Sequence, residues 1–346
     1  MILVLPCAGK SSRFPGVRPK FLLTHPAGDV MLLKSIELID MKDITSIFII
    51  SLREYEDTYH FKDAIVSELK RRYPDKMINV ELLAEPTRNQ PETIYQGLLH
   101  RYLTDEPLLI KDCDNQFMLK LDKNFNSVAV GNLHDYKYIN PTNKSYIEVG
   151  NNDQVVNIVE KQVVSPYFCA GAYYFKSVIQ FKKYYKQLQH EDNLYISHII
   201  YKMILDGEVF VDAPVNHYLD WGTLEDWTHY CYAYQTLFVD IDGVLVKSGG
   251  EGTWGKQPPL TNNIETLVNL FLAGYTHVVL TTSRPESYRE VTEEQLRNAG
   301  MKWHKLVMGL PHCRRVLIND FAVTNPYPSA ISINLLRDAD NLKEYL

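Results

Sequence analysis

The sequence of 346 residues lacks several features that would place it in a familiar class of protein. It has only five cysteines, which are scattered and show neither the paired spacing of a zinc site nor a disulfide framework. No apolar run approaches the roughly 18 residues of a membrane span, and no cationic stretch precedes the first apolar segment. These absences predict a protein of the reducing cytoplasm without a membrane anchor.

A basic domain is absent too. The formal net charge is -6 and no segment is strongly basic, which argues against nucleic acid as the main partner. Internal repeats and low-complexity tracts are also missing. With 45% hydrophobic residues, a chain of this length can bury a large core and form two domains. Composition leaves the oligomeric state open, so a homo-oligomer is not excluded.

The opening stretch Met1–Leu23 joins a short apolar run to a polar loop. Residues 2–5 predict a buried parallel strand, which breaks at Pro6. A loop with glycine, serines and cations can bind phosphate through turn N–H groups and positive charge. A Walker A motif would need glycine where Val4 stands, so the loop is of another kind. The candidate phosphate-binding residues are Ala8, Gly9, Lys10, Ser11, Ser12, Arg13 and Lys20.

Helical and strand patterns alternate after this loop. The predicted helices cover residues 30–39, 55–72 and 92–102, and the predicted strands cover residues 46–51, 78–83 and 107–111. Such alternation predicts a doubly wound parallel sheet, in which ligands lie beyond the carboxyl ends of the strands. The polar segment 85–90 is expected at the same edge as the opening loop.

Two carboxylates, Asp112 and Asp114, follow the strand predicted over 107–111. Mg²⁺ prefers oxygen ligands and usually takes one or two carboxylates together with substrate phosphates. Carboxylates at this spacing also cap turns, so the two residues alone leave both interpretations open.

With Arg13 and Pro19-Lys20, the opening loop resembles the signature loop of nucleotidyltransferases that make nucleotide-activated sugars and phospho-alcohols. Three later stretches continue the resemblance: Glu160-Lys161, Ala170-Gly171-Ala172 and Asp220-Trp221-Gly222-Thr223. The resemblance covers about Met1 to Tyr230 and implies a GT-A-like, Rossmann-like α/β domain over residues 1–232.

The resemblance also implies roles for individual residues. Arg13 and Lys20 would bind phosphate and stabilise charge in the transition state, and Lys161 would bind the phosphate of the second substrate. Gly171 would let substrate lie against the backbone. Asp114 and Asp220 would hold Mg²⁺, with Asp112 as a weaker candidate. The segment 85–90 would contact the nucleobase, although its residues do not identify the base.

A second domain, predicted over residues 233–346, starts with a short apolar strand at 236–239. The following Asp240-Ile241-Asp242-Gly243-Val244 resembles motif I of the haloacid-dehalogenase-like (HAD-like) phosphatases. In that family the first aspartate attacks phosphorus and the second transfers protons. Residues 281–285, after a strand at 275–280, resemble motif II, which implies that the Thr282 hydroxyl holds the phosphoryl group.

Other parts of the phosphatase pattern are less complete. Asn319-Asp320 resembles motif IV, with Asp320 as a magnesium ligand beside Asp240. Lys305 is the candidate for the motif III cation, with Arg314 and Arg315 as alternatives. The spacing between motifs leaves no room for a cap domain, and the glycine-rich segment 247–259 predicts a mobile flap.

Together these features predict a bifunctional α/β enzyme with two Rossmann-like domains. The first would transfer a nucleotidyl group from an NTP, expected to be CTP, to a phosphorylated sugar or phospho-alcohol with release of pyrophosphate. The second, a small cap-less HAD-like domain, would hydrolyse a phosphomonoester in the same pathway, in keeping with capsule or surface polysaccharide precursors. Mg²⁺ is the expected cofactor. The alternatives are a GT-A glycosyltransferase that uses a nucleotide-sugar, and a regulatory module that senses nucleotides without turnover.

Overall fold

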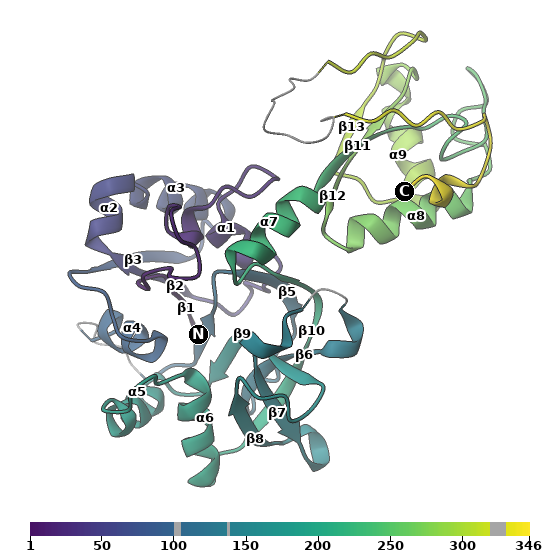
Figure 1. The fold of residues 1–346 in the computed structure, drawn as a ribbon. Helices are drawn as coiled ribbons and strands as arrows, with labels where there is room; N and C mark the ends of the chain where they lie inside the picture. Colours follow the sequence, from purple (N-terminus) through teal and green to yellow (C-terminus); the bar gives the residue numbers. More distant parts are fainter. Residues whose placement is uncertain (100–104, 137–138, 319–329) are drawn as a thin grey trace. The chain divides into compact units, whose positions relative to one another are not determined.

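The computed structural model describes residues 1–99, 105–136, 139–318 and 330–346 (Figure 1). The chain divides into two compact units, Met1–Cys231 (unit 1) and Tyr232–Leu346 (unit 2). Each unit has its own sheet and its own apolar core. Among the helices of the described ranges, none is long and apolar enough to cross a membrane.

The sheet of unit 1 has a parallel half. Its strands lie side by side in the order β3 (Met77–Leu83), β2 (Ser46–Leu52), β1 (Ile2–Pro6) and β4 (Leu108–Lys111). The sequence predicted each of these strands to within one residue at either end. Because β1 and β4 are parallel neighbours, the opening loop and the segment Asp112–Asn115 leave the sheet at the same edge.

The other half of this sheet is mixed, which corrects the prediction of a parallel, doubly wound sheet. Beyond β4 the order continues through β9 (Tyr167–Phe175), β6 (Asn126–Asn132), β10 (Phe210–Asp220) and β5 (Asn115–Leu119). Strand β9 is antiparallel to β4 and to β6, and β10 is antiparallel to β5. The hairpin of β7 (Ser145–Val149) and β8 (Val155–Glu160) pairs with β9 through β7. Short connections like the one between β7 and β8 join antiparallel strands, whereas parallel strands need long crossovers.

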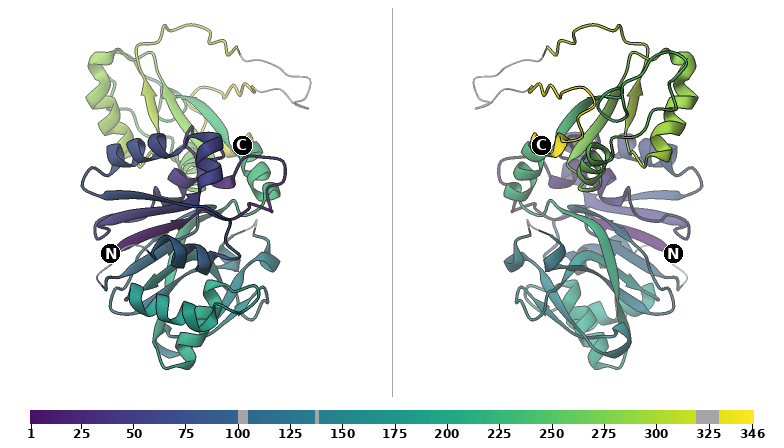
Figure 2. Two further views of the ribbon diagram at one scale, coloured as in Figure 1. Left: turned by 90° about the vertical axis from the view of Figure 1, so that its left-hand side faces the viewer. Right: turned by 90° about the vertical axis from the view of Figure 1, so that its right-hand side faces the viewer.

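Helices cover both faces of the parallel half (Figure 2). One face carries α1 (Met31–Ile36), α2 (Arg53–Tyr59) and α3 (Lys62–Arg72), and the other carries α4 (Gln90–Gly97), α5 (Val178–Leu188) and α6 (Ile196–Leu205). The predicted helix over 55–72 is therefore two helices. It breaks at His60, whose φ of 47° is left-handed. After the break, Glu56 Oε2 accepts a hydrogen bond of 2.9 Å from the N–H of Lys62, the first residue of α3.

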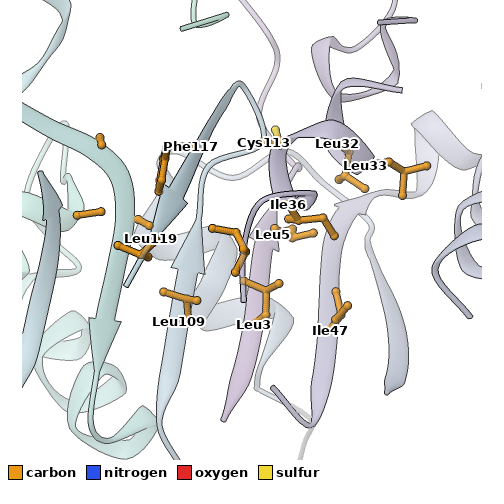
Figure 3. Packing of buried hydrophobic residues seen from close by; sticks show 14 of the residues in the cluster. Leu3, Leu5, Leu32, Leu33, Ile36, Ile47, Leu109, Cys113, Phe117 and Leu119 are labelled. Carbon is orange, nitrogen blue, oxygen red and sulfur yellow. The ribbon is translucent and has the colours of Figure 1, made fainter. Parts of the chain in front are cut away.

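Two apolar cores explain the composition of β1. Leu3 and Leu5 pack with Ile36 of α1 on one face of the sheet (Figure 3), whereas Ile2 and Val4 pack into the core under α4 to α6. A strand that is buried on both faces reads as a continuous apolar run rather than an alternating one. This burial fixes the strand from which the opening loop starts.

The helix α7 (Leu224–Ala233) is tied to the opening part of the chain through His25. Its Tyr230 lies 2.8 Å from His25 Nε2, and the backbone N–H of Ala27 donates to His25 Nδ1 at 3.0 Å. Since Nδ1 accepts, Nε2 carries the proton and donates to the tyrosine oxygen. Burial lowers the pKa of His25 from 6.5 to about 3, so the ring is neutral in the folded protein.

This buried histidine predicts acid sensitivity of unit 1. Below pH 6.5 the unfolded chain binds a proton that folded His25 excludes until about pH 3, so stability is lost as the pH falls through that window. Through His25, the free energy of unfolding should fall by about 1.4 kcal/mol for each pH unit in this window. Denaturant unfolding followed by fluorescence should show a shallower decline for His25→Gln than for the wild type. Equal slopes would rule out a neutral, buried His25.

Unit 2 contains a small parallel sheet with the strand order β11 (Gln235–Asp240), β12 (Thr276–Thr281) and β13 (Lys305–Val307). Its core includes residues of α8 (Thr261–Leu272) and α9 (Arg289–Asn298). The segment 247–259, which we expected to be a mobile flap, packs against neighbouring residues: Trp254 lies edge-on to Tyr288, with ring centroids 4.8 Å apart, and Gln257 O accepts from Gln295 Nε2 at 2.8 Å.

Candidate active site

A cleft of about 760 Å³ opens at the carboxyl ends of β1 and β4 in unit 1. It gathers almost all of the residues that the sequence predicted to bind substrates or metal in this unit. The predicted residues that line it are Gly9, Lys10, Ser11, Ser12, Arg13, Lys20, Asp112, Asp114, Lys161, Gly171 and Asp220. The exception is Ala8, whose side chain is completely buried under the loop. Four residues of the predicted nucleobase segment, Thr87 to Gln90, also line the cleft.

The opening loop folds back on itself at Ser11. This residue has a φ of 48°, a left-handed conformation that glycine adopts more readily than serine. Its carbonyl accepts from the N–H of Phe14 at 2.8 Å, and its hydroxyl accepts from the N–H of Lys20 at 3.4 Å. A side chain on Gly9 would meet no protein atom within 4 Å, so the backbone there faces open space in which a ligand can lie.

Asp114 is the electrostatic centre of the cleft. Lys20 Nζ lies 2.5 Å and Arg13 Nη2 3.4 Å from its Oδ2. Burial alone would raise the pKa of Asp114, but the positive charges of Lys20 and Arg13 outweigh it and hold the pKa well below its usual range. Burial alone would lower the pKa of Lys20, but the negative charge of Asp114 outweighs burial and raises it. Both side chains are therefore charged at neutral pH.

Asp220 lies beside Asp114, although the two come from distant parts of the sequence. Strand β10 pairs Asp220 with Asn115, and the N–H of Trp221 donates to Asp114 O at 2.9 Å. A Cβ atom on Gly222 would lie 3.2 Å from Asp220 Oδ1 and 3.8 Å from Asp114 Oδ2, so both carboxylates face the same point. Asp220 Oδ2 forms an ion pair of 2.6 Å with Lys144, a residue that the sequence analysis did not identify.

Asp112 is in a different environment. Its Oδ1 accepts from Gln90 Nε2 at 2.5 Å. Burial, and then the charge of Asp114, raise the pKa of Asp112. Gly171, at a φ of 89°, lines the cleft, but the space of its missing side chain is filled by protein: a Cβ there would lie 2.6 Å from Asp112 Oδ2 and 2.5 Å from Asn115 Nδ2. That Gly171 lets substrate lie against the backbone stays a prediction.

The residues at this edge fit a divalent cation that prefers oxygen. Within the described ranges, no group of three or more His, Cys, Asp or Glu side chains is arranged to hold a metal ion. Magnesium needs fewer, because it takes one or two carboxylates and completes its shell with water and substrate phosphates. Asp114 and Asp220 supply two carboxylates that face one point, whereas Asp112 turns to Gln90.

A buried lysine supports the loop that carries these aspartates. Lys111 has no exposed surface, and its Nζ donates to Asp112 O at 2.7 Å, to Asn115 O at 3.0 Å and to the Asn115 side chain. Burial lowers the pKa of Lys111 to about 8 despite the neighbouring carboxylates. Three acceptors from one turn fix the backbone of the loop, which positions Asp114.

Residues around Lys161, which we call the acceptor half of the cleft, suit a second substrate. Lys161, with a φ of 55°, lines it and donates to Tyr195 Oη at 2.7 Å. Glu160 accepts from the hydroxyl of Ser197 at 2.9 Å and from that of Ser145. A lysine beside a carboxylate and hydroxyls can bind a phosphate together with a polyol or sugar.

In unit 2, Asp240 ends β11 and Asp242 follows it. Arg284 is completely buried and holds both oxygens of Asp242, with Nη2 2.7 Å from Oδ1 and Nε 2.9 Å from Oδ2. Thr282 is buried as well and lies 3.4 Å from Asp242 Oδ2. The structure thus brings Asp242 and Thr282 together and adds Arg284, whose role the sequence analysis missed.

Two of the candidates for the motif III cation can be placed in the described part of unit 2. Lys305 begins β13 and pairs with Val279, whereas the carboxyl ends of β11 and β12 are level with Val307. Arg315, one of the alternatives, instead lies 3.3 Å from Asp240 Oδ1. Asp320, the predicted motif IV ligand, lies outside the described residues.

Comparison with known proteins places the fold. No family model matches the chain, and no curated protein matches its sequence. Among solved structures, a nucleoside-diphosphate-sugar pyrophosphorylase from Vibrio cholerae matches with a TM-score of 0.56 at 18% identity, over 66% of this chain and 99% of that one. A UDP-glucose pyrophosphorylase complexed with UDP-glucose matches with a TM-score of 0.51 at 14% identity, over 67% of this chain and 97% of that one.

A third solved structure, the inositol-1-phosphate CTP transferase from T. maritima, matches with a TM-score of 0.50 at 16% identity, over 65% of this chain and 90% of that one. At these identities the likeness is one of fold. The chain therefore contains the mixed α/β fold that sugar-phosphate nucleotidyltransferases share.

Proposed function

We propose that unit 1 transfers a nucleotidyl group from an NTP to a phosphorylated small molecule and releases pyrophosphate. The observation that carries this proposal is the convergence of Asp114 and Asp220, with Lys20 and Arg13, on one point of the cleft. Lys161 lines the same cleft on the other side. The names of the solved structures that share the fold support nucleotidyl transfer over glycosyl transfer.

The chemistry follows from the charges. A phosphate oxygen of the acceptor attacks the α phosphorus of the NTP in line, the bond to the bridging oxygen of the β phosphate breaks, and pyrophosphate leaves. No covalent enzyme intermediate is needed, because positioning and charge neutralisation supply the rate. Arg13 and Lys20 neutralise the NTP phosphates, and Lys161 holds the acceptor phosphate. Mg²⁺, held by Asp114 and Asp220, would add positive charge on the phosphates.

Unit 2 would hydrolyse a phosphomonoester. Asp240 would attack phosphorus and release the alcohol, and water would then hydrolyse the aspartyl phosphate. Asp242 would donate a proton to the leaving oxygen and later accept one from the attacking water, and Arg284 would orient the Asp242 carboxylate. CTP remains our expected nucleotide and a sugar phosphate or phospho-alcohol our expected acceptor, in keeping with a surface polysaccharide precursor.

A screen for pyrophosphate release tests the proposal. Each of the four NTPs is combined with Mg²⁺ and a panel of sugar 1-phosphates and phospho-alcohols. We expect one nucleotide and one class of acceptor to give pyrophosphate in proportion to product. No pyrophosphate from any combination, together with product in a parallel reaction that contains a nucleotide-sugar, would favour a glycosyltransferase and contradict the proposal.

Lys20 should contribute mainly to the transition state. Because Lys20 adds a preorganised positive charge next to the reacting phosphates, Lys20→Ala should lower kcat by about 10². Lys202→Ala is a suitable control, since Lys202 makes an exposed ion pair of 2.6 Å with Asp206. Steady-state pyrophosphate release measures both variants. A normal kcat for Lys20→Ala would remove this lysine from the mechanism.

A further inference from the structure

Lys144 connects the two halves of the cleft. Its Nζ pairs with Asp220 Oδ2 at 2.6 Å and donates to Tyr218 Oη at 2.8 Å. Its carbonyl oxygen accepts from the N–H of Lys161 at 3.0 Å, so the two lysines start from adjacent backbone positions. Both line the cleft. The ammonium of Lys144 is therefore next to a metal-facing carboxylate and starts beside the lysine assigned to the acceptor phosphate.

Both oxygens of Asp220 already have a partner. Lys144 occupies Oδ2, and Oδ1 accepts from the N–H of Gly222 at 3.2 Å. The side chains of Lys144 and Asp220 are only 12% and 7% exposed, so water screens the pair weakly. A divalent cation and an ammonium group compete for the negative charge of the same carboxylate, so Asp220 binds metal more strongly once Lys144 has moved away.

A phosphate group in the acceptor half offers Lys144 a second anionic partner. Lysine is a compact charge on a flexible stem, so its ammonium can exchange one anionic partner for another without movement of the backbone. A phosphomonoester beside Lys161 carries more negative charge than a carboxylate and offers several acceptor oxygens.

We propose that Lys144 is an acceptor-operated latch on Asp220. It pairs with Asp220 while the acceptor half of the cleft is empty, and it turns to the acceptor phosphate on binding, which frees Asp220 for the metal. The identification of the partner as an acceptor phosphate rests on the proposed function. The latch makes acceptor and metal bind cooperatively, and thermodynamic linkage requires each to strengthen the other by the same factor.

The test uses Mn²⁺ as a probe for the metal and methyl phosphate as a probe for the acceptor. Free Mn²⁺ is followed by electron paramagnetic resonance in titrations of the full chain, with and without methyl phosphate. Lys144→Gln removes the charge but keeps an N–H donor for Asp220. Without methyl phosphate, this variant should bind Mn²⁺ about tenfold more tightly than the wild type.

The effect of methyl phosphate on Mn²⁺ affinity should be weaker in Lys144→Gln than in the wild type. Methyl phosphate should tighten Mn²⁺ binding to the wild type by about tenfold, and by much less in Lys144→Gln, where no positive charge competes for Asp220. Coupling that persists in the variant measures direct contact between phosphate and metal. Lys144→Arg keeps the charge and should behave as the wild type does. Lys202→Gln removes a lysine from an exposed ion pair of the same length and should leave Mn²⁺ binding unchanged.

Two results would overturn the latch: Mn²⁺ affinity of folded Lys144→Gln equal to or weaker than that of the wild type, or undiminished coupling to methyl phosphate in that variant. If Lys144→Gln does not fold, Tyr218→Phe removes the hydroxyl that holds the ammonium and should tighten Mn²⁺ binding by a smaller factor. No turnover is needed, so tighter Mn²⁺ binding by Lys144→Gln supports the latch even if no NTP yields pyrophosphate. Pyrophosphate release by the wild type, with Mn²⁺ binding unchanged in Lys144→Gln, would contradict the latch and leave the proposed function intact.

Discussion

Asp114→Asn should lower the rate of pyrophosphate release by on the order of 10³, because it removes the charge around which the cleft is built. Lys20 and Arg13 both pair with this carboxylate, and together they hold its pKa well below the usual range despite burial. Asparagine keeps the shape of the side chain but offers neither cation a negative charge, and it gives a metal ion only a neutral oxygen.

Asp112→Asn is the sharpest comparison, because the two aspartates are only two residues apart. Burial and the charge of Asp114 raise the pKa of Asp112. Its Oδ1 accepts from Gln90, whereas Asp114 and Asp220 face a shared point, so asparagine keeps the shape of Asp112 without removing a carboxylate from that point. We expect Asp112→Asn to lower the rate by less than about tenfold, as for loss of a supporting contact.

Steady-state assays and Mn²⁺ titrations of the two variants measure this ranking, with the exposed substitution Asp57→Asn as control. Asp114→Asn should lose rate and Mn²⁺ affinity together, and Asp220→Asn should do the same. A greater loss in Asp112→Asn than in Asp114→Asn would show that the metal ligand is misassigned.

Asp240→Asn should abolish magnesium-dependent hydrolysis of an aryl phosphate by the full chain, because asparagine cannot attack phosphorus. The expected loss is at least about 10³, comparable to the removal of a catalytic nucleophile. Pyrophosphate release should stay within about twofold of the wild type, since the altered residue belongs to the other compact unit.

The measurement follows release of p-nitrophenol from p-nitrophenyl phosphate alongside release of pyrophosphate. The variant also controls for contaminating phosphatases, because any hydrolysis it retains does not come from Asp240. If the purified wild type hydrolyses the ester and Asp240→Asn does so equally well, unit 2 is not a phosphatase that uses this nucleophile.

The sequence predicted the parallel half of unit 1 well, because its strands are short apolar runs with both faces buried. Leu3 and Ile2, for example, enter opposite cores, and nothing but apolar residues satisfies such a strand. The antiparallel pairing in the mixed half escaped prediction, because it depends on contacts between strands rather than on local pattern.

In the candidate site too, residues in local motifs could be predicted, whereas contacts that depend on the fold could not. Asp114, Asp220 and Lys20 lie in recognisable motifs, so the sequence identified them before their positions were known. Lys144 stands in no motif, and only the hairpin of β7 and β8 and the ion pair with Asp220 bring it to the site. Arg284 is part of a motif, but its bidentate contact with Asp242 depends on how β12 lies beside β11.

The central claim, nucleotidyl transfer by unit 1, is tested most directly by following labelled phosphorus. The NTP carries the label at either the α or the γ position and is incubated with Mg²⁺ and the acceptor found in the screen. We predict that the α label appears in the product joined to the acceptor and that the γ label appears in pyrophosphate. Transfer of the γ label to the acceptor, or an α label that ends only in free nucleoside monophosphate, would contradict the account.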